Sequence, residues 1–484
     1  MSTSGRVAKN SLWLIAQPIL LNLLSLLAIP YIVRALGQAD YGRFTLGFAI
    51  IAMFTPLSNM GLRSVTVRHV AEDRATARQF ASNMLGARCV LAVATVAVIA
   101  IVVNLLRYDA STKLVAYLAS LTMLSETIVG TLQDVFQAFE NMRYVAYARF
   151  VGGFILTVLS VAVLLLGFGL IGLTLSYVLG SLLTVGVSWY YARKVIGSPR
   201  FIVDRRFLWK GLVEGMHFFY PSLVSIVCSK VGVSLLPLFG GIAAVGAYGA
   251  ATALIDRLLV FPDGICTAIF PTLAILHKNS PDEAAQLFRR YFEYLFMTGL
   301  PIAVGTTILA EPIVVLLFGR QYLSAIPVLV ILSWGLFLTF LASLQFWTLG
   351  AIHEEKKGAR IALIVTPLGV LFNLALIPYF HERGIAWANL AATLVSLVLL
   401  RHHIRRKFVR PIVSWSRLVR LVGASALMGL LVLPARKLNI AVPLAVGAVS
   451  YPLICLGIGL VSMGELKKLW ALVLRRTVPR AARG

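Results

Sequence analysis

Long apolar segments separated by short polar gaps run through the whole chain. A helix needs about 20 consecutive, mostly apolar residues to cross the roughly 30 Å hydrocarbon core of a bilayer. By that criterion the sequence contains fourteen candidate membrane spans. They are predicted at residues 11–33, 44–62, 84–106, 114–134, 145–166, 170–192, 214–236, 246–275, 291–310, 324–350, 361–380, 384–400, 415–433 and 440–462. The pattern predicts an all-α integral membrane protein.

Lys and Arg gather in alternate gaps between these spans. If the N-terminus is cytoplasmic, the two tails and the even-numbered gaps hold 34 of the 44 basic residues, and the odd-numbered gaps hold eight. Cytoplasmic loops of membrane proteins carry such an excess. We therefore expect a multi-pass membrane protein with both termini cytoplasmic. The net charge of +25 then reflects contact with anionic membrane lipids, and no nucleic-acid partner is expected.

Composition and motifs argue against an enzyme. The chain is 59% hydrophobic and only 13% charged, which excludes a soluble fold of 484 residues. Its gaps are too short for a catalytic domain, and it contains no Walker A, HExxH or nucleophile-elbow sequence. The four Cys residues lie singly in apolar segments, so we expect neither a disulfide framework nor a metal or cofactor site.

The chain also contains an internal echo. Pro30 is followed by Tyr41-Gly42, and Pro237, 207 residues further on, is followed at the same spacing by Tyr248-Gly249. Both copies connect spans in equivalent positions of two six-span halves. Two halves with the same orientation indicate a parallel repeat about an axis along the membrane normal, which is an architecture of alternating-access transporters. We predict lobes at residues 1–200 and 201–410, followed by two appended helices and a basic cytoplasmic tail at 411–484.

Four segments carry a resemblance to a known family: IPYIVRALGQADYGRF (29–44), PLSNMGLRSV (56–65), EPIVVLLFGRQYLSAIPVLVIL (311–332) and NLALIPYFHERGIAWANLAATL (373–394). They resemble the Wzx-type polysaccharide or O-antigen flippases of the multidrug/oligosaccharidyl-lipid/polysaccharide exporter superfamily. The resemblance extends over nearly the whole chain, and the family's fourteen helices match the count above.

This resemblance implies a function in surface polysaccharide biosynthesis. The substrate would be an undecaprenyl-diphosphate-linked oligosaccharide that is moved from the cytoplasmic to the outer leaflet, with a polysaccharide polymerase and a chain-length regulator as further partners. Two alternatives stay open within the same superfamily: a peptidoglycan-precursor (lipid II) flippase and a cation-coupled multidrug exporter. A membrane polymerase or ligase is disfavoured because the predicted outer gaps are short.

Ionisable side chains at membrane depth need a partner or a water-filled cavity, since inserting one costs about 2.5–3.5 kcal/mol. Lys230 and Arg257 lie in the middle of predicted spans, and Asp263 follows Asp256 by seven residues, on about the same helix face. A polar stripe at helical spacing marks the fourth span; its members are Glu126, Gly130, Gln133, Asp134 and Gln137.

A sugar-diphosphate headgroup requires cations at phosphate and amide or hydroxyl groups at sugars. The substrate-binding candidates are Lys230, Arg257, Arg63, Glu126 and Gln17, and the ion-coupling candidates are Asp256, Asp263 and Glu126. Structural roles stay open for several: Asp256 and Arg257 would also suit pairing with neighbouring helices, and Arg63 would suit a positive-inside anchor. Many members of the family carry an acid in the seventh span where this chain has Lys230. The ion-coupling role of that acid is therefore not transferred to this chain.

Overall fold

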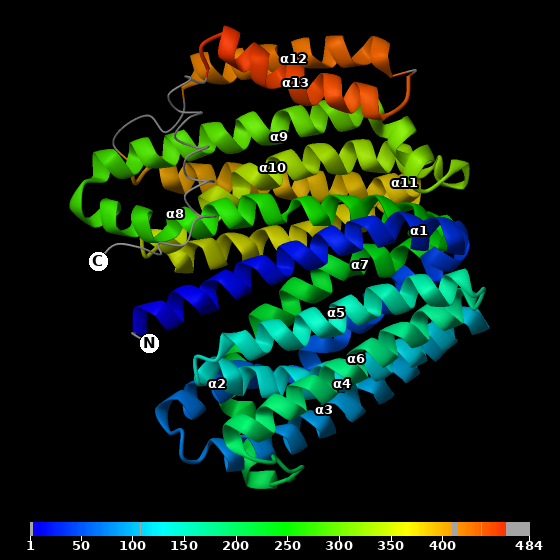
Figure 1. Cartoon of the computed structure of the whole chain (residues 1–484), viewed down its shortest axis with the longest axis vertical. Helices are drawn as coiled ribbons and strands as arrows, with labels where there is room; N and C mark the ends of the chain where they lie inside the picture. The colour runs from blue at the N-terminus through cyan, green and yellow to red at the C-terminus, as the bar shows by residue number, and fades with distance from the viewer. Residues whose placement is uncertain (1–2, 107, 409–413, 437, 461–484) are drawn as a thin grey trace, which may run out of the picture. The chain divides into compact units, whose positions relative to one another are not determined.

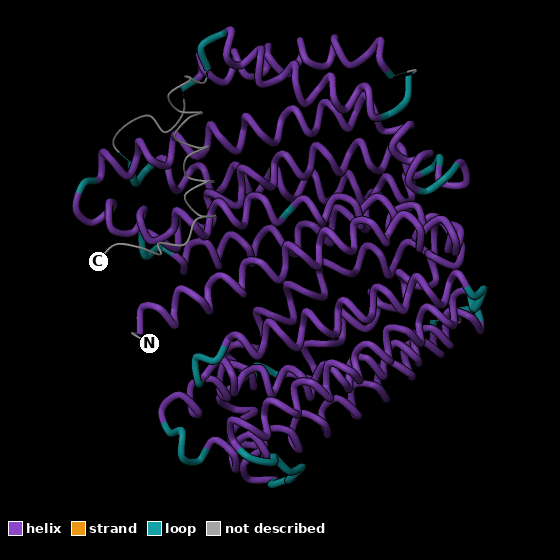
Figure 2. The backbone as a smooth tube through the Cα atoms, viewed as in Figure 1, coloured by secondary structure: helices purple, strands orange, loops and turns teal. Residues whose placement is uncertain are grey.

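The computed structural model describes residues 3–106, 108–408, 414–436 and 438–460, so the predicted basic tail lies outside the described residues. The described part contains helices and no strand (Figure 2). The helices, labelled in Figure 1, are α1 (Thr3–Asn59), α2 (Leu62–Glu72), α3 (Ala77–Leu105), α4 (Ala110–Ala138), α5 (Met142–Leu165), α6 (Gly169–Ile196), α7 (Arg205–Leu258), α8 (Val260–Asn279), α9 (Pro281–Leu317), α10 (Ala325–Ala351), α11 (Glu355–Arg405), α12 (Trp415–Ala435) and α13 (Ala441–Gly457), with a short 3₁₀ turn at Arg320–Tyr322.

Three of the long helices each contain a sharp bend between two predicted spans. The bends lie at Gly37 in α1 (φ 75°), Gly241 in α7 (φ 74°) and His381 in α11 (φ 50°). Glycine adopts this left-handed conformation without the steric cost of a Cβ. With these bends counted, the predicted spans correspond to helices or parts of helices, with two exceptions. The eighth, 246–275, covers the end of α7 and most of α8, and the last, 440–462, ends beyond the described residues. Among the described residues, ten helices are long and apolar enough to cross a membrane, which confirms the predicted all-α membrane fold.

The chain divides into two compact units, which we describe separately. The first contains Met1–Val260, Leu317–Val328 and Ala362–Ala392, and the second contains Phe261–Leu316, Leu329–Ile361 and Thr393–Gly484. These boundaries differ from the lobes expected at 1–200 and 201–410, and the division into those lobes stays a prediction. The first unit holds most of the polar residues singled out from the sequence.

Within the first unit, α1 and α7 pack closely just beyond their bends. A Cβ added to Gly42 would lie 2.1 Å from the backbone oxygen of Ile242, and one added to Gly246 would lie 1.9 Å from that of Gln38. Gly42 and Gly246 are 204 residues apart, and so are Gln38 and Ile242. The two contacts are therefore equivalent under the repeat, and the offset at this point is 204 rather than the 207 taken from Pro30.

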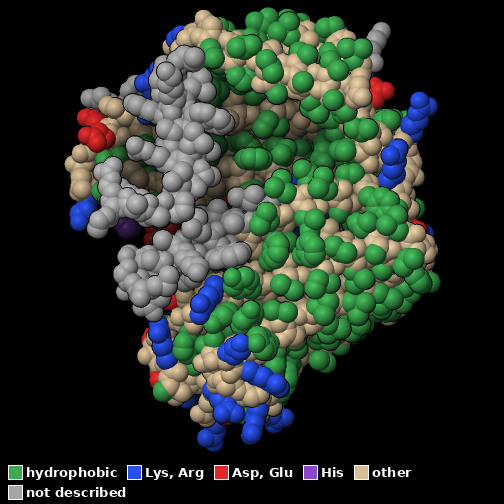
Figure 3. Space-filling view, viewed as in Figure 1, with side chains coloured by type: hydrophobic (Ala, Val, Ile, Leu, Met, Phe, Trp, Pro, Cys, Tyr) green, Lys and Arg blue, Asp and Glu red, His purple; other side chains and the backbone are tan. Residues whose placement is uncertain are grey.

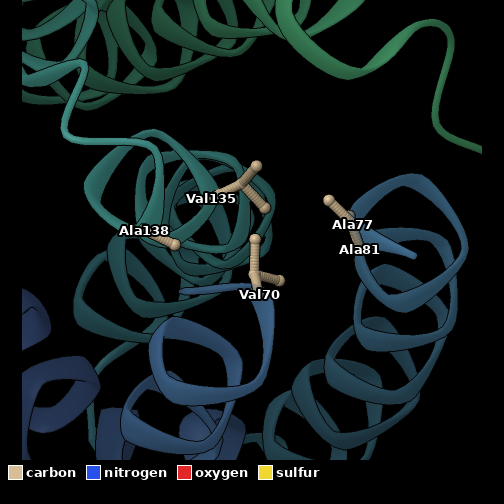
Figure 4. Packing of buried hydrophobic residues seen from close by; sticks show 5 residues of the cluster. All are labelled: Val70, Ala77, Ala81, Val135 and Ala138. Atoms are coloured by element: carbon tan, nitrogen blue, oxygen red, sulfur yellow. The ribbon is translucent and has the colours of Figure 1, made fainter. Parts of the chain in front are cut away.

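Small apolar side chains hold α2, α3 and α4 together (Figure 4). Val70 of α2, Ala77 and Ala81 of α3, and Val135 and Ala138 of α4 form one buried cluster. Because most of these side chains are alanine, the helix backbones approach closely, as in other membrane bundles. A second cluster, Leu85, Leu132, Phe136 and Ala192, continues the same packing and adds α6. Together the two clusters bury one side of α4 and so determine which of its residues face the other way.

The surface of α2 to α6 has the pattern of a membrane protein. Hydrophobic side chains cover the flanks, and Lys and Arg side chains gather at one end, where the α2–α3 and α6–α7 connections lie (Figures 1 and 3). Arg68, Arg74 and Arg200 are exposed at these connections, while Ile101, Val158 and Leu182 are exposed along the helices. Such an apolar surface is suited to lipid and not to water.

Candidate functional site

A cavity of about 540 Å³ lies inside the first unit, between α1, α2, α3, α4 and α5. Its volume falls in the range of small-molecule sites, which is about 300–1,000 Å³. Polar and charged side chains form much of the wall. They are Thr55, Ser58, Asn59, Arg63, Arg88, Thr122, Glu126, Thr127, Gln133, Asp134, Gln137 and Arg149.

One face of α4 supplies the floor of this cavity. Leu132 and Phe136 belong to the apolar cluster against α3 and α6, and Val135 to the cluster against α2 and α3. Gln133 and Asp134 lie at other angles around the helix and line the cavity. Glu126, Gly130, Gln133 and the following turns then line the cavity at intervals of three or four residues, which is the spacing of one helix face. The predicted polar stripe of the fourth span is thus a cavity wall.

Arg88 and Asp134 form a buried ion pair beside the cavity. The Arg88 Nη1 atom lies 2.9 Å from Asp134 Oδ2, and each side chain is 4% exposed. The same nitrogen donates to Thr131 Oγ1 at 2.9 Å, and Arg88 Nη2 donates to Asn59 Oδ1. Residues of α1, α3 and α4 thereby hold the guanidinium in one orientation.

Two further arginines extend this network into the cavity. Arg63 Nε lies 3.4 Å from Asp134 Oδ1, and its Nη2 donates to Gln137 Oε1 at 3.4 Å. Arg149 of α5 donates from Nε to Gln133 Oε1 at 3.0 Å. Both arginines are exposed, unlike Arg88. Their charges are therefore accessible to a ligand.

Two buried donors in the cavity wall have no acceptor among the described residues. They are Nε of Arg88 and Nε2 of Gln133, in side chains whose residues are 3% and 6% exposed. A buried donor without a partner costs about 1–3 kcal/mol, and nearly all buried polar groups in proteins are paired. Both atoms are buried, so a ligand that carries acceptor oxygens would pair with them only after the cavity wall rearranged.

The cavity has an excess of positive charge. Arg63, Arg88 and Arg149 contribute three cations, whereas Glu126 and Asp134 contribute two carboxylates. Asp134 is occupied by two of the arginines. Glu126 is exposed in its helix and lies within electrostatic range of Arg149. The wall as a whole suits a polar anion.

Two of the predicted substrate-binding residues, Arg63 and Glu126, line this cavity, and two arginines that line it were missed. The charge count assigns Arg88 to the cytoplasmic gap before the third span, although it falls inside that predicted span, 84–106. α3 begins at Ala77 and places Arg88 in the fourth turn of the helix. Arg149 was counted in the same way before the fifth span. One feature of the sequence could have indicated this position. Small and polar residues, Ser82, Asn83 and Gly86, precede Arg88, and such residues are unusual before a basic residue that anchors a loop.

Lys230, Asp256 and Arg257 lie outside the wall of this cavity, elsewhere in the first unit. Arg257 donates from Nε to Ser25 Oγ at 2.9 Å, which ties α7 to α1. Asp256 lies within electrostatic range of Lys230. Arg257 lies within electrostatic range of Tyr41. A structural role for Arg257, which the sequence left open, thus has a named partner, and a role for Lys230 or Arg257 in substrate binding stays a prediction.

The last two predicted site residues lie in different places. Gln17 is buried in α1, with 8% of the residue exposed, and it does not line the cavity. Asp263 is exposed in the first turn of α8, which belongs to the second unit. Substrate binding by Gln17 and ion coupling by Asp263 stay predictions.

Comparison with known proteins places this fold among lipid and drug transporters. The chain is similar to a protein of *Haloferax volcanii* described as a probable low-salt glycan biosynthesis flippase, Agl15, with 22% identity over 84% of this chain and 86% of Agl15. It shares its fold with a structure of the lipid II flippase MurJ in an inward closed conformation, with a TM-score of 0.75, 13% identity, and coverage of 92% of this chain and 98% of MurJ.

A second solved structure has the same fold. It is the inward-facing conformation of a multidrug resistance MATE family transporter of the MOP superfamily, with a TM-score of 0.64, 19% identity, and coverage of 80% of this chain and 95% of that transporter. The resemblance inferred from the sequence is confirmed. A family model described as "Polysaccharide biosynthesis protein" matches residues 7–277, more than half of the chain. The protein therefore belongs to the polysaccharide biosynthesis protein family.

Proposed function

We propose that the protein is a flippase that moves undecaprenyl-diphosphate-linked oligosaccharide repeat units from the cytoplasmic to the outer leaflet of the bacterial inner membrane. The observation that carries the proposal is the cationic cavity of the first unit, in which Arg88 Nε and Gln133 Nε2 are buried donors without acceptors in the described chain. A diphosphate supplies acceptor oxygens and negative charge, and sugar hydroxyls also supply acceptors.

The residue types in the wall suit the two parts of this headgroup. Guanidinium groups form paired hydrogen bonds with phosphate oxygens, and Arg63 and Arg149 are exposed for that contact. Amide and hydroxyl groups such as Gln137 and Thr127 suit the sugar. The polyprenyl chain would stay in the lipid, since it is apolar throughout.

The charge of the cavity disfavours the multidrug alternative. An exporter of lipophilic cations needs an excess of carboxylates and aromatic faces at its site, whereas this wall carries three arginines against two acids and no aromatic side chain. The lipid II alternative has the same diphosphate chemistry, so the wall does not separate it from the proposed substrate. The experiment below separates the two by the lipid that accumulates.

Alternating access would require the close contact between α1 and α7 to open. Gly42 and Gly246 bring no side chains to this contact, and Gln38 Nε2 bridges it by donating to Ala243 O and Ser324 Oγ, at 2.9 Å each. Opening would break these hydrogen bonds, and a complete separation of the two helices would also break the bond from Arg257 to Ser25. In the predicted topology this contact lies at the outer side, so its opening would release the headgroup to the outer leaflet.

Deletion of the gene tests the proposal. We expect lipid-linked repeat units to accumulate while lipid II stays at its normal level, measured by mass spectrometry of extracted polyprenyl-diphosphate lipids. Accumulation of lipid II and loss of viability would favour the peptidoglycan-precursor flippase. Unchanged levels of both lipids, with increased sensitivity to ethidium-like cations, would favour the multidrug exporter.

A further inference from the structure

A second polar cavity, of about 480 Å³, lies in the second unit between the N-terminal parts of α9 and α12. These helices and α13 run side by side in Figure 1. Leu309, Met428 and Val432 form an apolar cluster between α9 and α12, and the Tyr451 hydroxyl of α13 donates to Met297 O at 2.7 Å. The packing of the three helices fixes the shape of the cavity.

Glu293 orients two arginines in this cavity. Arg417 Nη1 of α12 lies 2.8 Å from Glu293 Oε2, and Arg289 Nε, one turn earlier in α9, lies 3.1 Å from Glu293 Oε1. Each carboxylate oxygen thus binds one guanidinium. Glu293 is buried, with 7% of the residue exposed, whereas the side chains of Arg289 and Arg417 are 38% and 53% exposed.

Tyr294 holds a third arginine at the same place. Arg290 donates from Nε to the Tyr294 hydroxyl at 2.8 Å, and its guanidinium carbon lies 5.5 Å from the centre of the Tyr294 ring. The wall therefore contains three guanidinium groups and one carboxylate, with a net charge of +2. An anion would reach the exposed arginines without displacing Glu293.

We propose that this cavity binds the phosphate headgroup of an anionic phospholipid from the cytoplasmic leaflet. Basic pockets between membrane helices on the cytoplasmic side are suited to such headgroups, and the charge pattern predicts that α9 and α12 begin on that side. Met297 and Leu421 add an apolar part to the wall, which a free phosphate ion would not use and which an acyl chain would contact.

The charge of the chain itself argues against an internal occupant. The segment after the described residues, 461–484, contains six Lys or Arg residues and one Glu, so it has the same sign as the cavity. An anionic lipid has the opposite sign and is abundant at the surface that the basic loops face. The site shares no residue with the cavity of the first unit, and the inference does not depend on the proposed transport substrate.

Native mass spectrometry of the purified full-length protein tests this site. The protein in detergent is incubated with phosphatidylglycerol or with phosphatidylcholine, and the bound lipid is measured over a concentration series. Both lipids offer phosphate oxygens, but the trimethylammonium group of phosphatidylcholine cancels its charge and would lie near three arginines. We therefore expect phosphatidylglycerol to bind at least about tenfold more tightly. Equal binding of the two lipids to the wild-type protein would overturn the proposal.

Two variants locate the binding. Arg290→Gln keeps both partners of Glu293 and should weaken phosphatidylglycerol binding severalfold. The triple variant Arg289→Gln, Glu293→Gln and Arg417→Gln removes two arginines together with the carboxylate that they bind, so no buried carboxylate is left unpaired. It should weaken phosphatidylglycerol binding about tenfold. Arg436→Gln is the matched control, because Arg436 pairs with Glu311 at 2.5 Å outside this cavity. Wild-type affinity in both cavity variants would contradict the assignment.

Competition identifies the source of the phosphate. Inorganic phosphate at millimolar concentration should not displace phosphatidylglycerol, because it lacks the apolar contact. Undecaprenyl diphosphate should displace it only when present in excess. Displacement by inorganic phosphate would show a simple anion site, and displacement by less than one equivalent of undecaprenyl diphosphate would assign the cavity to the lipid carrier; either result would overturn the phospholipid proposal.

Discussion

Arg88 Nη1 and Asp134 Oδ2 lie 2.9 Å apart, in side chains that are each 4% exposed, and join α3 to α4 beside the cavity of the first unit. Each of these two buried charges depends on the other for compensation. Arg63 is the other cation at Asp134, at 3.4 Å, and its side chain is 60% exposed. Arg88 is therefore expected to matter for folding as well as for substrate binding.

Substitution of Arg88 by alanine should destabilise the protein. The change leaves the Asp134 carboxylate buried with a single, more distant cation, which costs about 3–5 kcal/mol in comparable pairs. Thermal unfolding of the protein in detergent measures the loss of stability. The amount of protein in the membrane is a second measure. Arg88→Ala combined with Asp134→Ala should recover part of the loss; if the double variant is no more stable than the single one, the two residues do not act as a pair.

Substitution of Gln133 by methionine should separate binding from stability. Methionine keeps the volume and removes the unpaired donor Nε2. It also removes the Oε1 acceptor of Arg149, but Arg149 is exposed and can bind water instead, so the melting temperature should change little. Transport of lipid-linked oligosaccharide should fall by about tenfold or more if that donor binds the substrate. Reconstituted vesicles provide the assay. Full activity in this variant would remove Gln133 from the binding site.

Replacement of Lys230 or Arg257 by alanine tests the earlier sequence-based assignment. If these cations bind phosphate, each variant should abolish export of polysaccharide while its level in the membrane stays normal. Lys194→Ala is a suitable control, since Lys194 is exposed near the end of α6. Normal export in both variants would leave Arg257 with its structural contact to Ser25 and Lys230 without a transport role.

Substitution of Gly42 by valine should disrupt the contact between α1 and α7. Its Cβ would lie 2.1 Å from the oxygen of Ile242, and forcing extra atoms into such a contact costs about 1–3 kcal/mol or excludes the conformation. The expected result is a lower melting temperature and loss of transport. Gly186→Ala is the control within a helix of the same unit, where an added Cβ meets no atom within 4 Å; wild-type behaviour of Gly42→Val would refute the contact.

The stability of the loop between α10 and α11 should depend on pH, because Glu354 in this loop titrates. Hydrogen bonds from Lys407 and then Lys357 lower the pKa of Glu354 below its ordinary value of 4.5. Because the folded pKa is depressed, the stabilisation is present above pH 4.5 and is lost as the pH falls through the folded pKa. A ¹³C titration of the Glu354 carboxyl should show a higher pKa in Lys407→Met than in the wild type, with Lys357 still holding it below the ordinary value. Identical titrations would exclude the interaction.

The apolar pattern predicted the helices well because bilayer thickness sets a length that a sequence either meets or does not. It could not predict that α1 and α7 continue through their bends, since Gly37 and Gly241 resemble ordinary loop glycines in the sequence. The polar stripe of α4 was found because helical spacing places Glu126, Gln133 and Gln137 on one face.

Arg88 was missed for a physical reason that applies to other membrane proteins. Basic residues near predicted span ends are normally cytoplasmic anchors, and the N-cap residue of α3, Thr76, makes no side-chain capping bond that would mark the helix start. Whether an arginine lies in a loop or in the wall of a cavity depends on neighbouring helices. That information resides in the packing of Leu85 against Leu132 and Phe136, which no single-chain pattern contains.

The reciprocal contact of Gly42 with Ile242 and of Gly246 with Gln38 has the form of an isologous interface, in which two copies of one surface meet about a twofold axis. An ancestral chain of half this length would therefore have been able to associate with a second copy of itself through the same glycine and carbonyl. Fusion of the two copies would have freed each to diverge, so that the cavity with Arg63, Arg88 and Arg149 could arise in the first half.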